Sequence, residues 1–107
     1  MQLDPSAFAD SETIERAVRL PNGQETPLRF RVLSHGMLRK LMMQDNDEEA
    51  GIYSDHRLVA ACLVDDEGNT YLSPAQASSL KPLVFKQICD FAQEANAIGQ
   101  EAKTGNA

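Results

Sequence analysis

Residues 13–33, TIERAVRLPNGQETPLRFRVL, decide how the fold begins. Apolar residues alternate with polar ones in both halves of the stretch: Ile14, Val18 and Leu20 in the first, Leu28, Phe30 and Val32 in the second. Arg16 interrupts the first set, while the second is typical of a half-buried strand. Asn22-Gly23 lies between them and favours a hairpin, because both residues tolerate the positive φ of a tight turn. Pro27 lacks a backbone donor, so we expect an edge near the start of the second strand.

Two helices are expected after this hairpin. Ser34 can cap the first, which we expect to end near Gln44. Ser54 or Asp55 can cap the second, which runs into the unbroken apolar stretch 58–64. Periodicity does not separate a buried helix from a buried strand there. The acidic cap and the alanine pair favour a helix, after which the last two residues of the stretch can open a short strand.

A second, shorter hairpin and two more helices follow. Residues 65–69 are expected to form a turn and residues 70–72 its return. Ser73-Pro74, with Gln76 three residues after the serine, predicts a helix start. The last helix begins at Pro82 and carries apolar residues at steps of four and three: Val84, Ile88, Phe91, Ala95 and Ile98. Gly99 is expected to stop it.

The expected fold class is α+β, with an N-terminal β-hairpin followed by a small helical domain of about four helices and a short second hairpin. A chain of 107 residues can bury one modest core. We expect a flexible N-terminal arm over residues 1–11, a single compact domain over residues 12–99 and a disordered C-terminal tail over residues 100–107.

Composition and charge argue against several classes of function. Sixteen acidic residues against ten basic ones give a net charge of −6, which disfavours binding to nucleic acid or to an anionic membrane. The apolar stretch 58–64 is far shorter than the ~20 residues of a membrane span. The first residues lack the pattern of a secretion signal, so a cytoplasmic protein is expected.

No group of residues predicts catalysis or metal binding. Cys62 and Cys89 are widely spaced within apolar segments and are expected to be buried, reduced thiols. His35 and His56 have no partners at a nucleophile–base spacing. The acidic run 45–49 lacks the glycine and glutamate of a calcium-binding loop. We therefore expect no catalytic residue, no metal and no cofactor, and a protein that is not an enzyme.

Large apolar residues on the first helix are the candidates for binding a protein partner. Leu41, Met42 and Met43 follow one another and cannot all face the core of a single helix, and Met37 lies on the same face as Leu41. Methionine is common on adaptable binding surfaces. Two alternatives stay open: Met43 can instead cover a neighbouring element, and Phe8, the other candidate, can pack back onto the domain.

One stretch of the chain resembles a known family. Residues 57–69, RLVAACLVDDEGN, are followed by a short strand, by Ser73-Pro74 with Leu80, and by a helix ending in residues 94–99, EANAIG. Over residues 13–99 this order resembles the small tail assembly chaperones of long-tailed bacteriophages. The resemblance rests on turn and core residues, and such proteins have no catalytic residues to carry over.

The resemblance implies a function and partners. Such a chaperone binds the tape-measure protein and tail tube subunits in the bacterial cytoplasm and is absent from the mature virion. The chain would be the short product that precedes a programmed frameshift. A homo-oligomer is left open. The alternatives are a structural virion component, such as a head-tail connector or tail terminator subunit, a small bacterial protein-interaction domain, and a small enzyme or metal protein suggested by the acidic loops alone.

Overall fold

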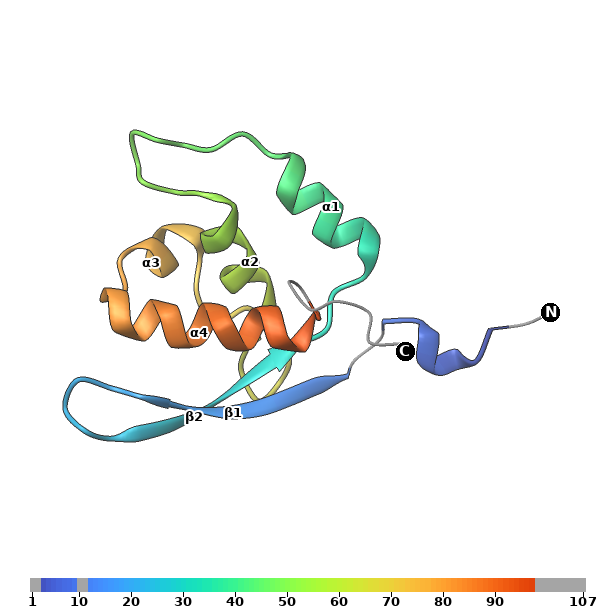
Figure 1. Ribbon diagram of the computed structural model, residues 1–107, viewed down its shortest axis with the longest axis horizontal. Helices are drawn as coiled ribbons and strands as arrows, with labels where there is room; N and C mark the ends of the chain where they lie inside the picture. Colours follow the sequence, from blue (N-terminus) through green and yellow to red (C-terminus); the bar gives the residue numbers. More distant parts are fainter. Residues whose placement is uncertain (1–2, 10–11, 98–107) are drawn as a thin grey trace, which may run out of the picture.

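A β-hairpin opens the fold, as the sequence predicts. The computed structural model describes residues 3–9 and 12–97. Strand β1 (Thr13–Arg19) pairs antiparallel with β2 (Glu25–Arg31), and each terminal residue of one strand lies opposite a terminal residue of the other. In Figure 1 the two strands form a long ribbon beneath the helices.

The turn of this hairpin differs from the tight Asn-Gly turn that was expected. The N–H of Leu20 donates to the carbonyl of Gln24 (2.8 Å), and the N–H of Gly23 donates to the carbonyl of Leu20 (2.9 Å). Pro21 and Asn22 are thus the two central residues of a β-turn, a position that suits the fixed φ of proline. Within this turn the positive φ falls on Gly23 alone, at 89°.

Pro27 lies on a free edge of its strand, as expected. Its partner in the register is Ala17. Hydrogen-bonded pairs alternate along an antiparallel ladder, and the bonded pair Leu20–Gln24 places Pro27 in a non-bonded pair. The proline nitrogen therefore points away from β1, so its missing hydrogen leaves the hairpin ladder intact.

A third strand enlarges the sheet in a way that the sequence did not predict. Strand β3 (Leu63–Val64) pairs antiparallel with β2 at Phe30 and Arg29, giving the order β1-β2-β3. The expected second hairpin is present, with Thr70 bridged back to Val64. Its first strand thus belongs to the same sheet as the N-terminal hairpin.

Helix α1 (His35–Met43) has the predicted bounds. The hydroxyl of Ser34 accepts a hydrogen bond from the N–H of Met37 (3.2 Å), and Gln44 ends the helix. The cap satisfies a backbone donor that the first helical turn leaves unpaired. The acidic run beyond the helix does not extend it.

Helix α2 (Ser54–Cys62) starts from a different cap than expected. Tyr53, rather than Ser54 or Asp55, occupies the N-cap position. The N–H of Tyr53 donates to Nδ1 of His56 (2.9 Å). The imidazole accepts a hydrogen bond from the N-cap N–H, as the glutamate of a capping box does. Asp55 lies in the first turn, where the helix dipole favours an acidic residue.

Helix α3 (Pro74–Ser78) confirms the predicted capping box. The N–H of Gln76 donates to Oγ of Ser73 (3.1 Å), and the N–H of Ser73 donates to Oε1 of Gln76 (2.9 Å). Pro74 takes the first helical position, where a missing N–H costs nothing.

Helix α4 (Pro82–Ala95) begins at the predicted proline but ends earlier than predicted. Asn96 is its C-cap, and Ala97 follows with a positive φ of 55°. The expected stop at Gly99, with Ile98 and the tail 100–107, lies outside the described residues. At this end the Asn96 side chain contacts the backbone of Arg31, the last residue of β2, and of Leu33 just beyond it.

Over the described residues, four α-helices lie on one side of the three-stranded antiparallel sheet, with α4 and α2 against it, which makes the fold α+β. Helix α4 contacts β1 and β2, and α2 lies between α4 and α1. The ring centroids of Phe30 and Phe91 are 5.8 Å apart. The most deeply buried side chains of the core are Val18, Phe30, Val59, Cys62, Leu63 and Ala92.

Candidate functional site

The predicted binding residues of α1 include three exposed methionines, and the helix has no buried residue. The exposed fractions of Met37, Met42 and Met43 are 40%, 63% and 72%. Leu41 is half-buried and packs with Leu38 against the core. The structure thus separates the predicted set into one residue that attaches the helix and three exposed methionines, which we call the methionine surface. At 3.6 residues per turn the three are spread around the helix, with Met43 opposite the attached side.

Helix α1 rests lightly on the rest of the molecule. In Figure 1 it stands apart from the sheet and leans toward α2. A small cavity of about 100 Å³ lies beneath it, lined by Leu38, Leu41, Met42, Ser54, Asp55, Leu58 and Gln93. Few side chains therefore hold α1 in place.

The segment between α1 and α2 is exposed and carries the acidic run 45–49. The backbones of Asp47 and Ile52 exchange two hydrogen bonds of 2.9 Å each, which close a small turn. Oδ1 of Asp47 accepts a bond from the N–H of Ala50 (3.1 Å). Within the described ranges, no group of three or more His, Cys, Asp or Glu side chains could hold a metal ion.

Phe8, the remaining predicted residue, lies on a separate surface. It follows η1 (Pro5–Ala7), a single turn of 3-10 helix that Asp4 caps by accepting a bond from the N–H of Ser6 (2.9 Å). This bond lowers the pKa of the Asp4 carboxyl. The exposed fraction of Phe8 is 62%, and Figure 1 shows the arm projecting away from α1.

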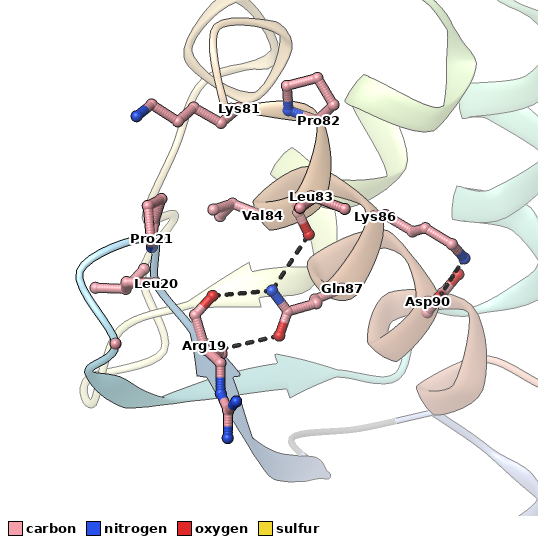
Figure 2. A pocket seen from close by; sticks show the side chains of 11 residues that line it. Arg19, Leu20, Pro21, Lys81, Pro82, Leu83, Val84, Lys86, Gln87 and Asp90 are labelled. Carbon is pink, nitrogen blue, oxygen red and sulfur yellow. Dashed lines mark hydrogen bonds and ion pairs between the residues drawn. The ribbon is translucent and has the colours of Figure 1, made fainter.

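A groove between the hairpin turn and the start of α4 was not predicted. It has a volume of about 860 Å³, within the ~300–1,000 Å³ range of ligand pockets. Leu20 and Pro21 line one side, and Pro82, Leu83 and Val84 line the other (Figure 2). The two walls are about sixty residues apart in the sequence, so no local pattern indicated it.

Gln87 closes the floor of this groove. Its Oε1 accepts a bond from the N–H of Arg19 (2.9 Å), and its Nε2 donates to the carbonyls of Arg19 (2.9 Å) and Leu83 (3.2 Å) (Figure 2). The amide side chain pairs with the free edge of β1 as a neighbouring strand would. The floor therefore has its hydrogen bonds satisfied, and the walls are left apolar.

Basic side chains surround the groove. Arg19 pairs with Glu25 (3.3 Å), and Lys86 pairs with Asp90 (3.0 Å). Lys81 forms no ion pair within the part of the chain that the structure describes. The charged side chains around the groove, counted with their ion-pair partners, have a net positive charge, whereas the whole protein has a net charge of −6.

The cysteines and histidines occupy structural positions. Burial raises the pKa of the Cys62 thiol to about 11 and also raises the pKa of the Cys89 thiol. His56 Nδ1 accepts the Tyr53 N–H, so the Asp55 carboxylate 3.6 Å away is not paired with a protonated nitrogen. His35 is exposed at the start of α1.

No protein-family model matches the chain, and no curated protein or solved structure is significantly similar to it. Among the described helices, none combines the length and the apolar character that crossing a membrane requires.

Proposed function

We propose that this protein is a non-catalytic chaperone of phage tail assembly that binds the tape-measure protein and tail tube subunits. The resemblance of residues 57–69 and of the surrounding element order to tail assembly chaperones supports this proposal. The observation that carries it is the methionine surface of α1, where Met37, Met42 and Met43 face solvent on a helix without buried residues.

A methionine surface suits a partner that must be held and later released. Methionine side chains are unbranched and re-pack around partners of different shape. Exposed large apolar side chains on one helix are candidate contacts for a protein partner. Leu38 and Leu41 pack α1 against the core above a small cavity, and we expect the helix to adjust its position when a partner binds.

The charge balance fits the same role. A net charge of −6 keeps a protein with an exposed apolar surface soluble and discourages self-aggregation. The proposed site of action is the cytoplasm of the bacterial host, and the protein is expected to be absent from the finished particle.

Co-expression with the cognate tape-measure protein tests the proposal. We expect the tape-measure protein to become more soluble and to co-purify with the chain. Met42→Asp and Met43→Asp should reduce the co-purified amount at least tenfold with an unchanged circular dichroism spectrum. Arg39→Gln is the matched control, because it also lowers the charge of α1 by one unit but leaves the methionines in place.

Two results would contradict the proposal. The first is a cognate tape-measure protein whose solubility does not change and which does not co-purify. The second is a stoichiometric amount of the chain in purified particles, detected by mass spectrometry, which would instead indicate a structural virion component.

A further inference from the structure

The groove presents apolar side chains that the fold does not require. Leu83 is the most exposed large apolar residue of the described chain, with 77% of its surface accessible. It occupies the first turn of α4, where an acidic residue would stabilise the helix through its dipole. No acidic residue is present in that turn, and the N-cap is Lys81. The first turn of α4 therefore lacks the stabilising interaction of an acid with the helix dipole. It presents the apolar side chain of Leu83 beside the positive charge of Lys81 instead.

The N-terminal arm has the complementary character. Leu3 and Phe8 are 66% and 62% exposed, and neither belongs to the buried core. Between them, Asp4 carries a carboxylate, and η1 gives the segment a defined shape. The arm is therefore a short, ordered segment with apolar side chains and a negative charge.

The geometry of β1 keeps Phe8 from its own groove. Phe8 precedes Thr13 by five residues, which span at most about 18 Å. From Thr13 the strand runs seven residues to Leu20, or roughly 23 Å, before the groove begins. Figure 1 shows the arm at one end of the hairpin and the turn with the start of α4 at the other.

We propose that the groove binds the N-terminal arm of a second copy of this chain. Phe8 and Leu3 of one copy pack against Leu20, Pro21 and Leu83 of the other, and Asp4 faces Lys81. Because Gln87 already pairs with the edge of β1 at Arg19, the arm docks through side chains and adds no strand there. Two antiparallel copies can make this contact twice, which closes the assembly as a dimer. This proposal stands independently of the chaperone function.

The oligomeric state of the full-length chain tests the contact. We expect the wild type to associate in sedimentation equilibrium, and Phe8→Asp and Leu83→Asp each to weaken association at least tenfold. Both side chains are exposed, so neither variant should lower the melting temperature of the monomer. Tyr71→Asp is the matched control: it places a carboxylate at another exposed large apolar residue, outside the groove, the arm and α1, and should associate like the wild type.

Mixing the two variants distinguishes arm exchange from any other self-association. Phe8→Asp retains an intact groove, and Leu83→Asp retains an intact arm. Each variant alone should be monomeric, whereas a 1:1 mixture should form a heterodimer through the single remaining contact. Lys81→Glu should weaken association and Asp4→Lys should restore it in the double variant. A wild type that stays monomeric at ~1 mM, or a mixture that shows no heterodimer, would overturn the proposal.

Discussion

The backbone N–H of Leu33 donates a hydrogen bond of 2.6 Å to Oδ1 of Asn96, which ties the chain leaving β2 to the end of α4. Nδ2 of the same amide lies 3.0 Å from the carbonyl of Ala92 and 3.1 Å from Sγ of Cys62. One side chain therefore joins the sheet, α2 and α4. Because Leu33 is itself buried, its N–H has few other partners available.

Asn96→Ala should destabilise the fold by about 1–3 kcal/mol, since it leaves a donor without a partner in a part-buried site. Urea unfolding monitored by circular dichroism measures the change. Asn46→Ala, in the exposed segment after α1, is the control and should change the unfolding free energy by less than about 0.5 kcal/mol. Equal stability of the two variants would show that the Asn96 contacts do not hold the helix to the sheet.

Gln87→Glu should destabilise the protein at neutral pH by about 1–3 kcal/mol. The acceptor toward the N–H of Arg19 is kept, but the former donor becomes an anionic oxygen facing the carbonyls of Arg19 and Leu83. This surrounding raises the pKa of the new carboxyl in the folded state. The Gln87→Glu variant therefore keeps its stability below the pKa that the new carboxyl has in the unfolded chain. It loses stability as pH rises through the pKa of that carboxyl in the folded protein. Thermal melts at pH 4 and pH 7 test this, and a pH-independent difference from the wild type would refute it.

The pair between Arg16 and Glu94 should make a small contribution that disappears in acid. Their side chains meet at 2.9 Å, and the hydrogen bond from Arg16 lowers the pKa of Glu94 from its ordinary value of 4.5. Because the pKa of Glu94 is lower in the folded protein, the stabilisation by its pair with Arg16 is present above the ordinary pKa of Glu94. It is lost as pH falls through the folded pKa. The wild type should therefore exceed Glu94→Gln in stability at pH 7, and the two should converge as pH falls below the folded pKa of Glu94. Both side chains are about 40% exposed, so added salt should also shrink the difference.

The thiols of Cys62 and Cys89 should resist alkylation in the folded protein. Burial removes access and raises the pKa of Cys62 to about 11, so little thiolate exists near pH 8. Mass spectrometry after iodoacetamide treatment should show an unmodified native chain and a doubly modified chain in guanidinium chloride. Asn96→Ala should speed the modification of Cys62 only by making the fold open more often, because the lost amide bond to the sulfur had lowered the pKa of the thiol. Rapid double labelling of the native protein would show that these helices open readily.

Local chemistry made much of the fold predictable. The alternation in β2, the cap at Ser34 and the capping box at Ser73 act within a few residues, and all three have the predicted structure. The prediction for the α2 cap was wrong because Ser54 and Asp55 are equally good caps in isolation, whereas His56 supplies the acceptor in the fold. The pairing of β3 with β2 was not predicted, since two residues carry too little pattern to choose a partner.

The two candidate binding surfaces, α1 and the groove, also differ in how far the sequence predicts them. The surplus of large apolar residues on α1 is visible in the sequence, and the structure leaves three of the four methionines exposed there. The groove is different, because its walls come from the hairpin turn and from α4. One local sign of it exists: Leu83 follows Pro82 in a helical first turn, where no preceding turn of the helix can cover a leucine side chain.

The light attachment of α1 has a consequence for how the molecule opens. A helix with two half-buried leucines and no buried residue can detach at a small fraction of the global unfolding free energy. Its amides should then exchange with deuterium through local opening, at a rate insensitive to low denaturant. The amides of β2 and α4 should exchange only with global unfolding. Helix α1 would therefore open locally in the free protein and become fully ordered when a partner binds it. The sheet would remain folded in both states.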